Sequence, residues 1–155
     1  MMENYLRLLN PKTTNYDAIG GGSHGAMTSQ DVCVALSYAR LTPVQNHLIE
    51  LCALNRNSIE QIKTSAQVIY GEFVRTQKAE MSQEHELSIF VAVVELCKVP
   101  ANYSPSERNR AVIAGVSRMQ IQRKLGQKIN YFKEQLQNEI EIASEKIKHQ
   151  LNKST

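Results

Sequence analysis

One continuous apolar stripe runs through the C-terminal part of the chain and forces it into a single helix. Its members recur every three or four residues, with a period of about 3.7, which indicates one face of an α-helix: Ile121, Leu125, Ile129, Phe132, Leu136, Ile140, Ala143, Ile147 and Leu151. We predict one long helix that reaches about residue 151. Roughly 30 residues at 1.5 Å each span about 45 Å, so the stripe needs a long cover. That cover is the segment Thr28–Val99, a second copy of the chain or another protein, and packing on its own domain is the simplest of the three.

The composition favours an all-α fold made of one domain with an arm. The 155 residues include no Trp and three Phe, so the core has to be largely aliphatic. Hydrophobic residues make up 42% and charged residues 21%, which is typical of a globular chain rather than a disordered one. We divide the chain into a flexible N-terminal arm (1–27), a helical bundle (28–101) and a C-terminal segment (104–153) that combines a helix-turn-helix with the long helix. The glycine run at 20–25 lacks the ending of a phosphate-binding loop, and we interpret it as a connector.

Capping signals mark the starts of the helices in the bundle. Thr28 opens a capping box, Thr42 stands before a proline at a second helix start, and Ser82 caps a later helix. Between them, the apolar residues of 59–74 recur at helical spacing. The run 87–96 is apolar nearly all round, which predicts the central core helix. Its β-branched residues also permit a strand, but no other strand candidate exists to pair with it.

The segment Pro105–Leu125 has the pattern of a helix-turn-helix. Ser104 and Glu107 form a capping box at the start of its first helix, with Pro105 at the first helical position. Gly115 ends this helix, because glycine adopts a left-handed conformation at low cost. Three further residues supply a small side chain at the helix crossing, an apolar plug in the angle and a cap for the second helix: Ala111, Val116 and Ser117.

The outward face of this motif is basic. Between Glu107 and Lys128, six basic residues stand against one acidic residue, so this stretch carries a charge of +5 whereas the whole chain carries +3. Concentrated positive charge is typical of phosphate binding, and the N-terminal turns of the second helix enter the major groove in such motifs. Double-stranded DNA is therefore the expected partner. We assign base reading to Ser117, Arg118, Met119, Gln120, Gln122 and Arg123. We assign phosphate contacts to Arg108, Arg110, Lys124 and Lys128. Arg110 stands where such motifs commonly have an apolar residue.

Other classes of function find little support. Cys33, Cys52 and Cys97 are isolated thiols in apolar segments, and we interpret them as small core residues in a reducing compartment. The histidines lack metal-ligand spacing, so we expect no metal and no cofactor. The acidic residues beside His85 point apart on a helix, and we expect no enzymatic activity. No apolar run approaches the roughly 20 residues of a membrane span, and the first ten residues lack the apolar block of a signal peptide. We therefore expect a cytoplasmic protein with no membrane partner.

Two groups of residues, one near each end, are shared with a known family. Near the start the chain has Asn10-Pro11-Lys12-Thr13 and then Met27-Thr28-Ser29-Gln30-Asp31-Val32 with Ala35-Leu36; toward the end it has Tyr103-Ser104 and Arg110-Ala111-Val112. In these positions it resembles the lambda-type Q late antitermination proteins of bacteriophages, as a compact form that lacks the zinc-binding cysteine pairs of that family. The resemblance implies a protein that binds a DNA element beside a promoter and joins a paused host RNA polymerase with its sigma factor, which then resists terminators. It also implies that residues 118–123 contact DNA.

We predict from these features a sequence-specific DNA-binding transcription regulator, most concretely a phage late-gene antiterminator that loads from a DNA site onto host RNA polymerase. One alternative is a dimeric helix-turn-helix repressor or activator that self-associates through the long C-terminal helix. Another is a helical protein-interaction module, such as a phage inhibitor of a host complex, whose basic face contacts a protein. The symmetry of the DNA site and the salt dependence of binding separate these alternatives.

Overall fold

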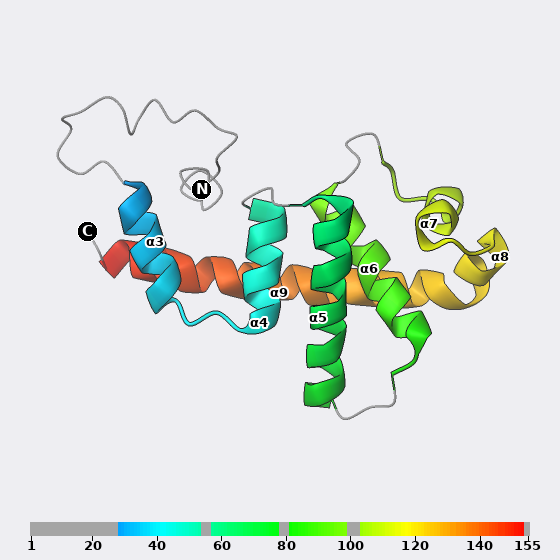
Figure 1. Cartoon of the computed structure of the whole chain (residues 1–155), viewed down its shortest axis with the longest axis horizontal. Helices are drawn as coiled ribbons and strands as arrows, with labels where there is room; N and C mark the ends of the chain where they lie inside the picture. Colours follow the sequence, from blue (N-terminus) through cyan, green and yellow to red (C-terminus); the bar gives the residue numbers. More distant parts are fainter. Residues whose placement is uncertain (1–27, 54–56, 78–80, 99–102, 154–155) are drawn as a thin grey trace.

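The computed structural model describes residues 28–53, 57–77, 81–98 and 103–153, and every regular element within them is helical (Figure 1). This confirms the predicted all-α fold. The longest element, α9 (Gly126–Lys153), runs along most of the length of the molecule, and the other helices lie across it or near its ends. The expected N-terminal arm (1–27) lies outside the described residues. None of the described helices is long and apolar enough to cross a membrane.

Capping residues set the starts of several of the helices that precede α9. These elements are, in chain order, α3 (Ser29–Tyr38), α4 (Pro43–Leu48), the π-helical turn η2 (Ile49–Ala53), α5 (Ile59–Gln77), α6 (Gln83–Cys97), α7 (Glu107–Ala114), α8 (Arg118–Gln120) and the π-helical turn η3 (Ile121–Leu125). Thr28 and Thr42 each form a capping box, as predicted. At the start of α6 the backbone amide of Ser82 donates to His85 Nδ1 at 3.0 Å, so a histidine occupies the place of the usual acidic residue.

The apolar stripe of the C-terminal helix forms the spine of the core, as its spacing predicts. Eight of its nine members are buried, and Ile140 is partly buried. α6 covers the half of the stripe nearer α8, while α3 and α4 cover the half nearer the C-terminus. There, Ala143, Ile147 and Leu151 form a second cluster with Val32 of α3. The chain's own helices therefore cover the stripe, which is the first of the three covers considered above.

α6 is the central helix of the core, as its apolar run predicts. Ile89 and residues 91–94 are fully buried, because α5 packs on one side of α6 and α9 on another. α6 ends at Cys97, and the capping residue Lys98 that follows has a φ of 56° and so lies in the left-handed region. The strand that the β-branched residues also permitted is not formed.

The three cysteines differ from one another. Cys33 is exposed, so its interpretation as a core residue is wrong: α3 buries Val32 and Ala35, and the residue after Val32 points about 100° away from that face. Cys52 and Cys97 are partly buried against the core, but they are not isolated, since their Sγ atoms lie 3.4 Å apart. Within the described ranges, no group of three or more His, Cys, Asp or Glu side chains could hold a metal ion.

Candidate nucleic-acid interface

α7 begins two residues later than the sequence suggested. Ser106, and not Ser104, is its N-cap, because the Ser106 hydroxyl accepts a hydrogen bond from the Asn109 amide at 3.1 Å. The Asn109 side chain also donates to the Ser104 carbonyl at 2.8 Å, which ties the residues before the helix to its first turn. Pro105 therefore lies outside the helix. The predicted capping box of Ser104 with Glu107 is wrong because both serines precede a suitable partner by three positions, and the spacing does not choose between them.

The turn between α7 and α8 follows the predicted local pattern. Gly115 has a φ of 70°, in the left-handed region that glycine adopts at the lowest cost. The Val116 amide donates to the carbonyl of Ala111, a buried residue, at 3.1 Å. Ser117 caps α8, because its hydroxyl accepts from the Gln120 amide at 3.2 Å. A tight turn thus joins α7 to the helical segment that continues through η3 into α9.

This helical segment does not break at Gly126 but widens just before it. In η3 the backbone hydrogen bonds span five residues rather than four, and the Gly126 amide donates to the Ile121 carbonyl. The Ile121 oxygen lies only 2.7 Å from the place that a Cβ at position 126 would occupy. A side chain there would collide with the backbone, so glycine fits this wide turn. The sequence marks Gly126 as a weak spot in a helix, but it does not reveal the change in helical pitch.

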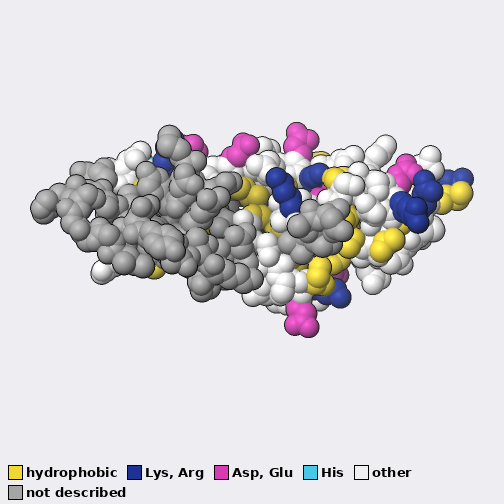
Figure 2. All heavy atoms as spheres, turned by 90° about the horizontal axis from the view of Figure 1, so that it is seen from above, with side chains coloured by type: hydrophobic (Ala, Val, Ile, Leu, Met, Phe, Trp, Pro, Cys, Tyr) yellow, Lys and Arg dark blue, Asp and Glu magenta, His cyan; other side chains and the backbone are white. Residues whose placement is uncertain are grey.

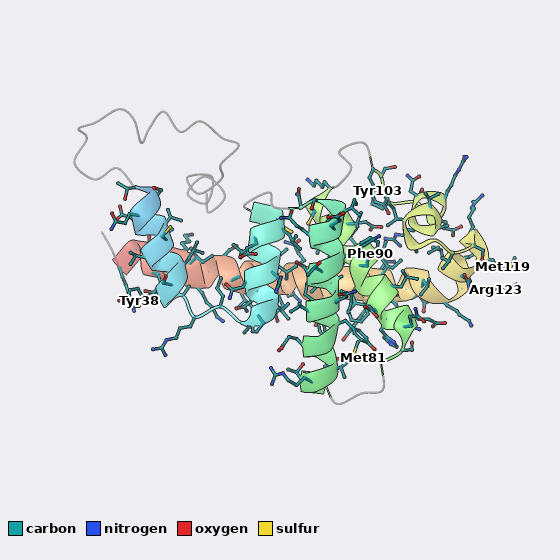
Figure 3. The ribbon with its side chains drawn as sticks, in the orientation of Figure 1. Tyr38, Met81, Phe90, Tyr103, Met119 and Arg123 are labelled. Carbon is teal, nitrogen blue, oxygen red and sulfur yellow. The ribbon has the colours of Figure 1, made fainter. Side chains whose placement is uncertain are left out.

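The exposed side chains at this end of the molecule are basic and polar. Arg118 leaves 69% of its side chain exposed, and Met119 is 55% exposed. Figure 2 shows Lys and Arg side chains gathered at the end that carries α7 and α8, and Figure 3 shows Met119 and Arg123 on the outer side of that end. The following exposed residues, all of them in the predicted DNA-contacting set, are called the basic tip: Arg108, Ser117, Arg118, Met119, Gln120, Gln122, Arg123 and Lys124.

Arg110 does not belong to the basic tip. Only 12% of its side chain is exposed, and its guanidinium faces the buried carboxylate of Glu95 on α6. Its Nε and one terminal nitrogen donate to the two Glu95 oxygens at 2.8 and 2.9 Å, and the same terminal nitrogen donates to Asn130 Oδ1 at 2.9 Å. The structure therefore does not support the assignment of Arg110 to DNA phosphate, because its side chain is largely buried and two of its three nitrogens are hydrogen-bonded inside the protein. The same pairing explains why a charged residue can stand where an apolar one is common.

Two further side chains complete the surroundings of Glu95. The Tyr103 hydroxyl donates to Oε2 at 2.8 Å, and the Lys133 ammonium lies 3.0 Å from Oε1. Burial raises the pKa of the Glu95 carboxyl, but the hydrogen bonds from Arg110, Lys133 and Tyr103 outweigh this effect and hold the pKa below its usual value. We call these four residues the Glu95 cluster. It joins α7 and the residues before it to α6 and α9. The Glu95 cluster therefore positions α7, which carries Arg108 of the basic tip.

Lys128 is also paired within the protein. Its ammonium lies 2.8 Å from Glu84 of α6, and its side chain is 32% exposed. The hydrogen bond from Lys128 lowers the pKa of the Glu84 carboxyl. The negative charge of Glu84 in turn offsets the positive charge of Lys128. Glu107 lies 4.0 Å from Arg118 and offsets part of the charge there. The positive charge of the basic tip is therefore carried by Arg108, Arg118, Arg123 and Lys124.

The sequence contains a signal for Glu95 that our sequence interpretation did not use. Glu95 interrupts an otherwise apolar run on the central helix, and a carboxylate placed in a core has to be paired with positive or hydrogen-bonding groups. Its partners are 8, 15 and 38 residues away along the chain, at Tyr103, Arg110 and Lys133. The need for partners was predictable from the run itself, whereas their identity depends on how α7 and α9 pack against α6.

Comparisons with known proteins do not assign this interface to a family. No protein-family model matches the chain. No curated protein and no solved structure matches it either. The role of the basic tip therefore has to follow from the charge, exposure and hydrogen bonding of its own residues.

Proposed function

We propose that this chain is a sequence-specific DNA-binding transcription regulator that binds double-stranded DNA through the basic tip. The observation that carries the proposal is the gathering of exposed basic and polar side chains on the first turns of the helix that begins at Arg118. In helix-turn-helix proteins this part of the second helix enters the major groove. The left-handed Gly115 and the cap at Ser117 support the proposal, since they fix where that helix starts.

Base reading falls to the exposed residues of α8 and η3. Arginine pairs with guanine and glutamine with adenine, and each good bidentate pair contributes about 1–3 kcal/mol of discrimination. An apolar side chain at the outermost point, here Met119, suits the methyl group of thymine. The proposed base-reading residues are Arg118, Met119, Gln120, Gln122 and Arg123.

Phosphate binding falls to the flanking residues. Arg108 on α7 and Lys124 on η3 are both exposed. Lys128 contributes less to this role, because binding a phosphate requires it to share its ammonium with Glu84. Ser117 keeps its hydroxyl as the cap of α8, so its role is to place the helix rather than to read a base.

The more specific proposal is a phage late-gene antiterminator that loads from a DNA site onto host RNA polymerase with its sigma factor. It depends on the resemblance to the Q family, and one feature of the fold suits it. The DNA-contacting turns and the spine of the core belong to one continuous helical segment, so the bound DNA and the body of the protein would move as a unit. The dimeric alternative would have to use exposed residues of α9 such as Tyr131 and Ile142, because the apolar stripe is already covered.

Selection of bound sequences from a random duplex library with the purified full chain tests the proposal. Enrichment of a non-palindromic consensus is the expected result. A palindromic consensus would favour the dimeric repressor or activator, because a two-fold dimer reads two equivalent half-sites. No enrichment would favour the protein-interaction module and overturn the assignment of DNA as the partner.

Two double variants separate the proposed roles on the selected site. Arg118→Ala/Arg123→Ala should lose sequence discrimination, by about 1–3 kcal/mol for each arginine that reads a base. Arg108→Ala/Lys124→Ala should weaken all sequences alike and reduce the slope of log K against log salt by about 2. The matched control removes two exposed lysines near the opposite end of α9, Lys148→Ala/Lys153→Ala, and changes the net charge equally. If the Arg118/Arg123 variant binds DNA as the parent does, the base-reading assignment fails.

A further inference from the structure

Two cysteines that lie far apart in the sequence meet at the end of the central helix. Cys52 lies in η2, and Cys97 is the last residue of α6. Their Sγ atoms are 3.4 Å apart, and both side chains are partly buried against the main core cluster. Cys33, which is exposed on α3, takes no part in this contact. The fold therefore holds one specific pair of thiols together.

The geometry of the pair is close to that of a covalent bond. A disulfide has an S–S distance of about 2.05 Å, so the two sulfur atoms need to approach by roughly 1.4 Å. The partial exposure of both residues lets a small oxidant reach them. The hydrogen bond with Cys97 lowers the pKa of the Cys52 thiol, against the opposite effect of burial. Cys52 is therefore the thiol better suited to attack first, because the thiolate is the reactive form.

We propose that Cys52 and Cys97 form a reversible intramolecular disulfide by exchange with a small disulfide oxidant of the glutathione type. The Cys52 thiol loses its proton and attacks one sulfur of the oxidant, whose S–S bond breaks and releases one reduced thiol. The Cys97 thiol then loses its proton and attacks Cys52 Sγ, which breaks the mixed disulfide and releases the second reduced thiol. The two protons end on the two released thiols. Overall, two protein thiols are oxidised and one oxidant disulfide is reduced to two thiols.

The bond would join η2 to the C-terminal end of α6 and close a loop between positions 52 and 97. Closing such a loop restricts the unfolded chain and stabilises the folded one. Cys97 also lies two residues after Glu95, the residue that anchors α7. We therefore expect the C-terminal end of α6, from which Glu95 anchors α7, to be more stable in the oxidised form than in the reduced form. The proposal itself does not depend on DNA binding.

Oxidation of the folded, full-length chain with oxidised glutathione, followed by alkylation and peptide mass mapping, tests the proposal. The expected result is a mass loss of about 2 Da, a cross-linked peptide pair that contains Cys52 and Cys97, and an alkylated Cys33. Addition of dithiothreitol should restore all three free thiols, and the melting temperature should rise on oxidation and return on reduction. The Cys33→Ser variant is the matched control and should behave as the parent does.

Other products would overturn the proposal. These are a cross-link that includes Cys33, stable glutathione adducts on Cys52 or Cys97, or two thiols that stay reduced while Cys33 reacts. Because the products are mapped on the unmodified sequence, the test does not depend on whether a cysteine variant folds. As a further check, Cys52→Ala should abolish the loss of 2 Da and leave Cys97 free or capped by glutathione.

Discussion

Replacing Gly126 by alanine tests whether the wide turn η3 requires a glycine. In an ordinary helix interior this change is favourable by about 0.5–1 kcal/mol, because alanine loses less conformational freedom on folding. At position 126 the new Cβ would lie 2.7 Å from the Ile121 carbonyl oxygen, a backbone atom that cannot rotate away. Overpacking of this kind costs about 1–3 kcal/mol. We therefore expect Gly126→Ala to lower the free energy of unfolding rather than to raise it.

The chain supplies its own control at Gly71. This glycine lies within α5, and a Cβ added there meets nothing within 4 Å. Gly71→Ala should accordingly gain the ordinary 0.5–1 kcal/mol or so. For a chain of this length, each kcal/mol moves the melting temperature by about 2–4 °C. Urea and thermal unfolding of both variants should then place Gly71→Ala above the parent and Gly126→Ala below it.

The same substitution also bears on the basic tip. If alanine instead converts η3 into ordinary α-helix, the segment before it turns by roughly 100° relative to α9, because the extra residue of the wide turn is absorbed. Arg118 and Arg123 would then face a different direction, and duplex DNA binding should weaken even where stability is retained. Equal stabilisation by Gly126→Ala and Gly71→Ala, with unchanged DNA binding, would refute the reasoning about η3.

Three other predictions concern the core and the Glu95 cluster. Glu95→Ala should lower the free energy of unfolding, measured in urea, by about 3 kcal/mol. This is the low end for a broken buried ion pair, because Arg110 and Lys133 are partly exposed. A change below about 0.5 kcal/mol, typical of a surface site, would contradict the buried pairing. The pKa of Glu95 is lower in the folded chain than the ordinary carboxyl value of 4.5. The ionised carboxylate therefore contributes fully to the free energy of unfolding above pH 4.5, and this contribution is lost as the pH falls through the pKa of the folded chain. The loss of stability in acid should accordingly be smaller in Glu95→Gln than in the parent. Phe132→Ala should cost about 3–5 kcal/mol, whereas Ile142→Ala at an exposed position of α9 should stay within about 0.5 kcal/mol.

Local rules explain which parts of the fold were predictable from the sequence. The long helix followed from a spacing that repeats over eight intervals, and its buried members are the ones that the spacing selects. The caps at Thr28, Thr42 and Ser117 followed from side chains that act within three residues of themselves. Gly115 followed from the one backbone conformation that glycine favours. All of these depend on neighbours in the chain, which are visible in the sequence.

Two of the features that were wrong or missing depend on residues far apart. As a charged residue in a basic stretch, Arg110 is expected on the outer surface from the sequence, and only the packing of α7 on α6 brings it to Glu95. The contact of Cys52 with Cys97 joins positions 45 residues apart, and their separate spacings give no hint of it. The prediction of Ser104 as the N-cap of α7 is wrong for a local reason, because Ser106, two positions later, can act as a cap in the same way. Spacing rules list the possible partners, and tertiary packing chooses among them.

The Glu95 cluster also explains how a short, polar helix can be held in place beside the core. α7 has one buried residue, Ala111, and its partly buried Ile113 and Ala114 also pack against the core, while Val112 is 74% exposed, so apolar burial contributes only part of its attachment. Four hydrogen-bonding contacts to the buried carboxylate of Glu95 also attach α7 to the core, and one of them comes from Lys133 of α9. An attachment of this kind depends on the charge of Glu95 and on its partners more than on shape. Because only one residue of α7 is buried, this end should open locally before the core does. The position of α7, and with it that of Arg108 in the basic tip, therefore depends on a charged group that the tip itself does not contain.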